Sequence, residues 1–315
     1  MRNKKQLEIR IGILGSTGYI GRSLLAEGLS RGFAVVPFSR DQARAKEIFS
    51  RYGISPKEEI RTYSELGSEK FDVIINASGI GSPSEYQKNP SAVFEATESM
   101  DALLLSYLQS EGNEGVRVFN ISSGSVYGLS AAGGVTDATE ARFKINALSS
   151  SDYYTLAKLS SEAKHRAHAQ YSIIDLRVFS FFSAYVSLTE SFFLSQVMDA
   201  LERKEELVTK GDSMVRDCMT TEDLLEAIMF LVGREAQNEV FDLVTRAPFE
   251  KFELLTLLEE KYSLAWRTDD IGIQSTTGEK PVYASQSDKL ARLGFTSKYT
   301  STEGIAHEME KYFAR

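Results

Sequence analysis

The sequence predicts an α/β protein built on a doubly wound parallel sheet, with a smaller, mostly helical C-terminal lobe. Short apolar runs alternate with segments of helical periodicity through the first half of the chain, and a glycine-rich turn follows the first run. Past Phe182 the alternation weakens. We therefore expect a dinucleotide-binding sheet domain at residues 8–180, to which residues 216–245 return. A substrate-binding lobe is expected at residues 181–215 and 246–315.

Each element is predicted from its own residue pattern. Short continuous apolar runs indicate strands buried on both faces of a parallel sheet, at Ile9–Leu14, Phe33–Phe38, Phe71–Asn76, Val116–Ile121 and Ser172–Phe179. Apolar residues at helical spacing predict helices at Arg22–Ser30, Ser91–Ser110 and Asp152–Gln170. A further strand, expected near Ile60–Tyr63, is weakly marked. The C-terminal half is expected to hold a strand at Val240–Val244 and helices at Glu190–Arg203, Thr221–Val232, Lys251–Lys261 and Thr302–Tyr312.

Composition argues against several classes of protein. The net charge of −8 disfavours a nucleic-acid surface, which needs clustered Lys and Arg. No apolar run approaches the ~18 residues of a membrane span, and the first one is too short for a signal peptide. The single cysteine, Cys218, fits a reducing cytoplasm. We expect no metal site, and we expect His165, His168 and His307 on solvated helix faces.

The first turn predicts a Rossmann-type dinucleotide site, because it lies between a strand and a helix. Its first glycine permits the tight turn, the second lets the backbone approach a pyrophosphate, and the third allows close helix packing. The pyrophosphate would lie at the positive end of the helix. The predicted cofactor-binding residues here are Gly15, Ser16, Thr17, Gly18, Tyr19, Ile20 and Gly21.

The end of the second strand indicates which dinucleotide binds. NAD sites usually carry an acidic residue there, whereas NADP sites offer an arginine to the 2′-phosphate. In this chain Ser39 occupies the acidic position and Arg40 follows it, which favours NADP(H). The alternative is that Arg40 is a solvated loop charge and that Asp41 swings in to bind NAD(H).

Hydroxyl side chains and a Tyr-x-x-x-Lys pair mark the expected reaction centre. The strand Val116–Ile121 leads into Ser122, Ser123 and Ser125, at a sheet edge that faces the nicotinamide in this fold. Tyr154 and Lys158 are four residues apart and so share one face of a helix. One such pair is expected by chance, so the pair gains meaning only from its setting.

Together these motifs resemble the extended branch of the short-chain dehydrogenase/reductase superfamily, the NAD(P)-dependent sugar-nucleotide epimerases, dehydratases and reductases. The resemblance covers nearly the whole chain. Further motifs that carry it are Asn76-Ala77-Ser78-Gly79, Glu162 one turn after the lysine, and Arg216-Asp217 through Asp223-Leu224. The resemblance implies that Asn76, Ala77 and Ser78 bind the cofactor.

The resemblance also implies the catalytic roles. Ser123 would bond the reacting substrate oxygen, Tyr154 would be the acid/base, and Lys158 would bond the nicotinamide ribose. Ser125 would assist, and Arg216 would bind the substrate diphosphate, although a structural pair with Asp217 is the alternative. Homodimers are frequent in this superfamily, often through the helix that carries the tyrosine, so a homodimer is expected.

Three functions remain open. The first is NADP(H)-dependent reduction of a keto group on a nucleotide-linked deoxysugar, which Arg40 favours. The second is an NAD-dependent nucleotide-sugar epimerase. The third is a non-enzymatic NADP-binding sensor or scaffold, which does not require Ser123, Tyr154 and Lys158 together. A dehydratase is disfavoured, because the resemblance implies Thr-Asp-Glu in that class at the positions where this chain has Ser123-Gly124-Ser125.

Overall fold

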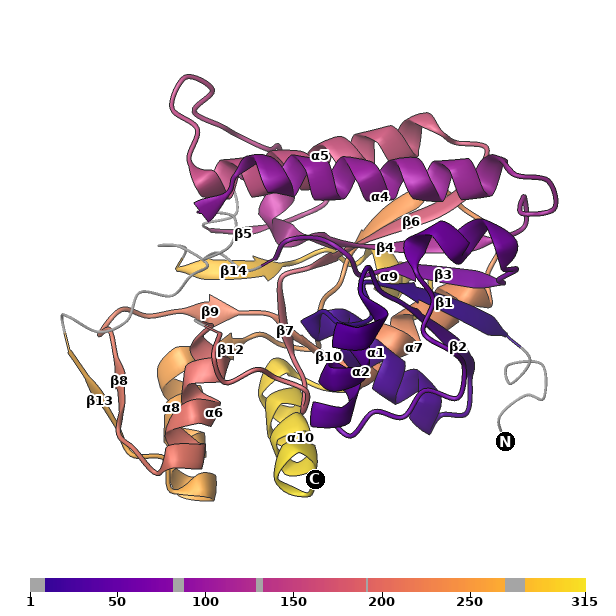
Figure 1. Cartoon of the computed structure of the whole chain (residues 1–315). Coiled ribbons are helices and arrows are strands. Elements are labelled where there is room, and N and C mark those ends of the chain that lie inside the picture. The colour runs from indigo at the N-terminus through magenta and orange to yellow at the C-terminus, as the bar shows by residue number, and fades with distance from the viewer. Residues whose placement is uncertain (1–8, 82–87, 129–132, 191, 270–280) are drawn as a thin grey trace.

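A wholly parallel six-stranded sheet forms the centre of the protein (Figure 1). This computed structural model describes residues 9–81, 88–128, 133–190, 192–269 and 281–315. The strand order is β11-β6-β4-β3-β1-β2. The strands are β1 (Arg10–Leu14), β2 (Ala34–Phe38), β3 (Val73–Asn76), β4 (Arg117–Ser123), β6 (Ser172–Val178) and β11 (Glu239–Asp242). The predicted fold class is confirmed.

Helices cover both faces of this sheet. The helices α4 (Ser91–Gln109) and α5 (Ser150–Ala167) lie side by side over one face, and α1 (Tyr19–Ser30) and α7 (Thr221–Val232) pack together over the other (Figure 1). Alternate residues of each strand serve the two faces. The buried apolar side chains form one core with α1 and α7 and a second core with α4.

In the first half, one expected strand does not form and one helix was not predicted. Near Ile60–Tyr63 the chain makes only a single parallel bridge, between Phe38 and Arg61, and no strand. The reason is the run of charged residues there, which leaves too little apolar side chain to bury at the sheet edge. The helix α2 (Gln42–Arg51) was not predicted, because only Ala45 and Phe49 of its residues are buried.

The C-terminal part has a core of its own and is mixed rather than mostly helical. The helices α6 (Phe193–Arg203), α8 (Lys251–Tyr262) and α10 (Ser301–Phe313) enclose this core. Short strands accompany them: β5 (Gly133–Val135), β7 (Ser180–Phe182), β8 (Leu207–Thr209), β9 (Val215–Arg216), β10 (Cys218–Thr220), β12 (Phe249–Glu250), β13 (Trp266–Thr268) and β14 (Val282–Ser285), with the short helix α9 (Lys289–Arg292). Four of these strands pair in the order β12-β9-β14-β5. The domain limits given above stay a prediction.

A buried polar network crosses the sheet beneath α4 and α5. Asn76 donates to Asn120 at 2.8 Å, and Asn120 donates to Asp175 at 2.7 Å, from matching positions on β3, β4 and β6. His165 of α5 then lies between two carboxylates, 2.9 Å from Asp175 and 3.3 Å from Asp101. The expectation that His165 is solvated is wrong, because its side chain is 1% exposed.

This arrangement predicts a pH-dependent contribution to stability. Burial disfavours charge on the ring, but hydrogen bonds and charge from Asp101 and Asp175 raise the pKa of His165 to about 9. Since this lies above the unfolded value near 6.5, the contribution is complete below pH 6.5 and is lost as the pH rises through 9. We expect it to amount to about 3 kcal/mol of unfolding free energy.

Denaturant unfolding of wild type and His165→Gln between pH 6 and 9.5 measures this contribution. The free energy of unfolding should fall less steeply above pH 6.5 in the variant than in wild type. The variant His168→Gln, at a less buried histidine, should show the same fall in unfolding free energy as wild type. Equal pH slopes for wild type and His165→Gln would contradict the charged-pair account.

Candidate active site

The glycine turn packs closely against the backbone of the loop that follows β3. Gly15 has a φ of +76°, and a Cβ there would lie 2.6 Å from the Ser78 nitrogen. A Cβ on Gly21 would overlap the Gly15 carbonyl oxygen. The helix α1 begins directly after Gly18, earlier than expected, so Tyr19, Ile20 and Gly21 form its first turn. Their N–H groups have no partner within the helix, and this geometry fits a pyrophosphate.

The other side chains of the turn hold it in place. The Ser16 hydroxyl is buried and donates to the Phe38 carbonyl at 2.8 Å. The phenol oxygen of Tyr19 accepts from the Ser183 N–H at 2.8 Å. The Thr17 carbonyl accepts from Arg22 at 3.3 Å. Of the predicted cofactor residues, Ser16 and Tyr19 thus have structural side-chain contacts, and their backbone remains the predicted cofactor contact.

Ser39, Arg40 and Asp41 follow the end of β2, and the one carboxylate among them is turned to the helix α2. Ser39 is buried, and its hydroxyl donates to the Asp41 carbonyl at 3.1 Å. The Asp41 carboxylate caps α2, where it accepts from the Arg44 N–H at 3.0 Å. Arg40 is exposed, and its charge opposes the rise that burial causes in the pKa of Tyr63. Asp41 is therefore engaged elsewhere, which weakens the alternative in which it binds a ribose.

The loop after β3 is fixed by Asn76. The buried carboxamide oxygen of this residue accepts from the Ser78 N–H at 3.1 Å and from the Ser78 hydroxyl. The Ala77 N–H donates to the Leu14 carbonyl at 3.0 Å. Asn76, Ala77 and Ser78 consequently lie beside the glycine turn, and their contact with the cofactor stays a prediction.

The hydroxyl side chains meet at the carboxyl end of β4. The Ser123 Oγ accepts from the Ser125 N–H at 3.1 Å and lies 3.2 Å from the phenol oxygen of Tyr283. The Ser125 hydroxyl oxygen is buried and has no hydrogen-bond partner in the described ranges. Ser122, in contrast, donates to the carboxylate of Glu162. A hydroxyl that is buried and unpartnered is suited to contact a polar ligand.

The helix α5 brings Tyr154 and Lys158 to the same loop. Lys158 is 9% exposed, and its ammonium donates to the Ile121 carbonyl at 2.9 Å and lies 3.7 Å from the position a Cβ would take on Gly79. Tyr154, one turn earlier, packs against the small apolar cluster of Val93 and Ala157. The structure thus places the Lys158 ammonium between β4 and the loop after β3, with Tyr154 one turn earlier on the same helix.

A charged network behind Ser122 was not predicted. The Arg177 guanidinium pairs with Glu162 at 2.6 Å and donates to the Tyr127 hydroxyl at 2.8 Å, and the Tyr127 hydroxyl in turn donates to Asp242 at 2.8 Å. Burial raises the pKa of Glu162, and the Arg177 charge opposes this rise. The network holds the 3-10 helix η3 (Gly124–Tyr127) against β6, and so it fixes the chain around the hydroxyl cluster.

Arg216 reaches the hydroxyl cluster through Tyr283. Its guanidinium is buried on β9 and lies 5.9 Å from the centre of the Tyr283 ring. Burial lowers the pKa of Arg216 to about 10, so the side chain is charged at neutral pH. Asp217 accepts from the Thr245 N–H at 3.0 Å, and the ligand role of Arg216 stays a prediction. Sequence reasoning missed Tyr283, because no motif surrounds it.

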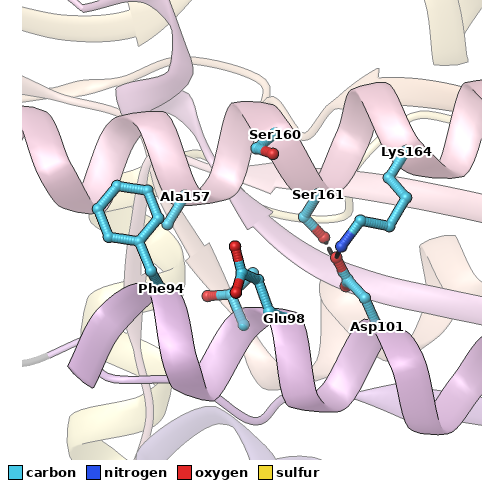
Figure 2. A pocket seen from close by; sticks show the side chains of 8 residues that line it. Phe94, Glu98, Asp101, Ala157, Ser160, Ser161 and Lys164 are labelled. Atoms are coloured by element: carbon cyan, nitrogen blue, oxygen red, sulfur yellow. Dashed lines mark hydrogen bonds and ion pairs between the residues drawn. The ribbon is translucent and has the colours of Figure 1, made fainter. Parts of the chain in front are cut away.

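A groove between α4 and α5 is separate from these residues. Figure 2 shows it lined by side chains of the two helices, among them Phe94, Glu98 and Asp101. Asp101 accepts there from Ser161 at 2.8 Å and from Lys164 at 3.0 Å. The groove contains none of the predicted site residues, and the homodimer expected through the helix of Tyr154 stays a prediction.

The described ranges contain no metal-binding cluster and no membrane-spanning helix. No group of three or more His, Cys, Asp or Glu side chains there could hold a metal ion. In the same ranges, no helix combines the length and apolar character needed to cross a membrane.

One comparison with known proteins identifies a family for this chain. Residues 11–243 match the NAD dependent epimerase/dehydratase family, and no curated protein matches the sequence. Among solved structures, a UDP-glucose-4-epimerase of Stenotrophomonas maltophila with bound NAD and formylated UDP-arabinopyranose is 19% identical, with 97% of this chain and 98% of that chain covered and a TM-score of 0.75.

Two further solved structures are similar. A UDP-glucose 4-epimerase of Thermotoga maritima with UDP-glucose is 18% identical, covers 97% of this chain and 99% of its own, and has a TM-score of 0.76. A double mutant of a dTDP-glucose 4,6-dehydratase of Streptomyces venezuelae with NAD bound is 16% identical, covers 97% of both chains, and has a TM-score of 0.74. At these identities the likeness shows the fold.

Proposed function

Because this chain belongs to the NAD dependent epimerase/dehydratase family, of the extended short-chain dehydrogenase/reductase type, we propose that it epimerises a nucleotide-linked sugar by oxidation and re-reduction at one carbon. The family gives the cofactor class, NAD(P). The UDP-sugar epimerases among the similar structures support the substrate class.

One observation carries this choice over dehydration. A Cβ on Gly124 would overlap the Phe179 ring, so position 124 cannot hold the acidic side chain that a dehydratase would need there. Elimination of water requires an acid and a base in addition to the groups that serve hydride transfer. With Ser123 and Ser125 on either side of a covered glycine, the site is equipped for proton and hydride transfer at a single carbon.

The side chains of this site can divide the reaction between them. The bound nicotinamide would accept and return the hydride. The Tyr154 phenol would take the proton of the substrate hydroxyl and return it, because it is the acid/base group of the set. Lys158, held by the Ile121 carbonyl, would orient the cofactor ribose and favour the phenolate of Tyr154 by its charge. Ser123 would hold the reacting oxygen.

The proposal is tested by identifying the nucleotide released on denaturation and by incubating the protein with UDP-glucose. An epimerase should carry bound NAD. It should convert at least one of UDP-glucose, UDP-glucuronic acid and dTDP-glucose to its epimer. The NADH absorbance should show no net change during this conversion. Protein that arrives empty and produces no epimer from this panel would contradict the proposal.

A reductase that exchanges NADPH at every turnover is the second candidate. It is favoured by the exposed Arg40 beside Ser39 and by the engagement of Asp41 as a helix cap. If Arg40 binds the 2′-phosphate, Arg40→Ala should weaken NADPH binding about tenfold, since one charge-assisted contact is worth roughly 1.5 kcal/mol. NADH binding should be unchanged.

Fluorescence titration of both nucleotides against wild type and Arg40→Ala measures that preference. Arg44→Ala is the matched control, because Arg44 follows on the same helix start. If Arg40→Ala weakens the binding of NADPH and NADH equally, or weakens neither, Arg40 is an ordinary surface charge. The epimerase would then be the remaining candidate function.

A further inference from the structure

We propose that Tyr283 is a positioning residue for Ser123, whose hydroxyl it holds as a hydrogen-bond donor to the reacting oxygen of the substrate. The inference rests on the proposed function, in which Ser123 bonds that oxygen. Tyr283 comes from β14, 160 residues further along the chain, and belongs to none of the motifs described above.

The argument begins with the hydrogen-bonding capacity of Ser123. A serine hydroxyl has one proton and two lone pairs. The Ser125 N–H occupies one lone pair at 3.1 Å, and the phenol of Tyr283, at 3.2 Å, can occupy the second. With both lone pairs used, the hydroxyl can interact further only by donating its own proton. A fixed donor is what a substrate oxygen needs when it gains negative charge.

The surroundings of Tyr283 favour donation by the phenol. Distance alone leaves open which of the two hydroxyls donates. The buried guanidinium of Arg216 lies 5.9 Å from the Tyr283 ring centre. A positive charge beside a phenol makes the phenol a stronger donor and a weaker acceptor. The reason is that the charge stabilises the partial negative charge that the phenol oxygen gains when it shares its proton with an acceptor. The Arg216 charge therefore favours Tyr283 as the donor and Ser123 as the acceptor in this pair.

The position of the phenol is set by regular structure. Tyr283 is 4% exposed, and its ring packs on Phe179 with centroids 5.1 Å apart. It is paired with Arg216 in the parallel ladder of β14 and β9. Phe179 also covers Gly124, so one aromatic contact fixes both the phenol and the turn that carries Ser123. Groups held by strands and packing are oriented more narrowly than groups on free loops.

Removing only the hydroxyl tests the proposal. Tyr283→Phe keeps the ring against Phe179, and we expect kcat to fall about tenfold, which is less than the 10²–10³ lost with a whole donor, because Ser123 itself stays in place. KM should stay within about twofold, because ground-state contacts are unchanged. The control is Tyr107→Phe, which removes another buried phenol that donates to a single carbonyl, that of Glu69 at 3.1 Å, and should leave kcat as in wild type.

A double-mutant cycle separates positioning from other roles. If Tyr283 acts through Ser123, Tyr283→Phe should have no further effect on kcat in a Ser123→Ala protein. The same tenfold loss in both backgrounds would overturn the proposal, as would an unchanged kcat for Tyr283→Phe alone.

A crystal structure of Tyr283→Phe supplies a readout that needs no turnover. We expect the Ser123 side chain to leave its single position and occupy more than one rotamer. A Ser123 that keeps its wild-type rotamer overturns the positioning role even if the wild type epimerises UDP-glucose. Conversely, a wild type without activity on any nucleotide sugar contradicts the proposed function, while the Ser123 rotamer still decides the role of Tyr283.

Discussion

Tyr154→Phe is expected to lower kcat on the nucleotide sugar about a thousandfold, since a positioned acid/base group contributes roughly 10²–10⁴ to the rate. The ring should keep its packing against Val93 and Ala157, so NAD affinity and the unfolding midpoint should stay near wild type. Removal of the hydroxyl therefore isolates proton transfer from cofactor binding.

The neighbouring residue provides a matched control for this variant. Tyr153 lies on the same helix and contacts Phe94 with ring centroids 6.3 Å apart. Tyr153→Phe should turn over at the wild-type rate. Steady-state kinetics and NAD titration of both variants decide the matter. If Tyr154→Phe keeps more than a tenth of wild-type turnover, the acid/base assignment is lost, and if Tyr153→Phe is the inactive one, the roles are exchanged.

Gly21→Ala is expected to have the largest effect on binding. The added methyl would overlap the Gly15 carbonyl oxygen, and a backbone atom cannot move aside as the end of a side chain can. Overpacking of this kind costs about 3 kcal/mol at the upper end of its range. The first turn of α1 would move away from β1, and NAD affinity should fall at least tenfold with the displaced N–H groups.

Denaturant unfolding and NAD titration measure the two effects together. Gly211→Ala is the control, because a Cβ on Gly211 would meet nothing within 4 Å. That variant should match wild type in both measurements. A Gly21→Ala protein with unchanged stability and NAD affinity would show that the turn can open without loss, contrary to its role as a rigid phosphate site.

What the sequence predicted correctly is local. Apolar runs such as Phe71–Asn76 are readable because a strand buried on both faces needs a continuous apolar stretch. The turn from Gly15 to Gly21 is readable because a backbone constraint selects one residue type. The position of the hydroxyl side chains after β4 could be predicted because the apolar strand before them could be predicted.

What it could not predict depends on partners distant in the chain. The strand β14 has four residues and pairs with strands from two other regions, so no periodicity marks it. His165 was misplaced because a histidine on a helix has no sequence signal for the two carboxylates that face it, one from α4 and one from β6. Tyr283 shares this difficulty, since its importance arises only where β14 meets Ser123.

The contact between Ser123 and Tyr283 also has a consequence for how the protein matures. During synthesis the glycine turn, β4 and the helix of Tyr154 all leave the ribosome well before β14, and domains fold as their residues emerge. A nascent chain can thus form the cofactor groove while the reaction centre still lacks its last member. Contacts of such high sequence separation form late, because the loop between them must first be closed. Competence to bind the dinucleotide should therefore precede competence to react.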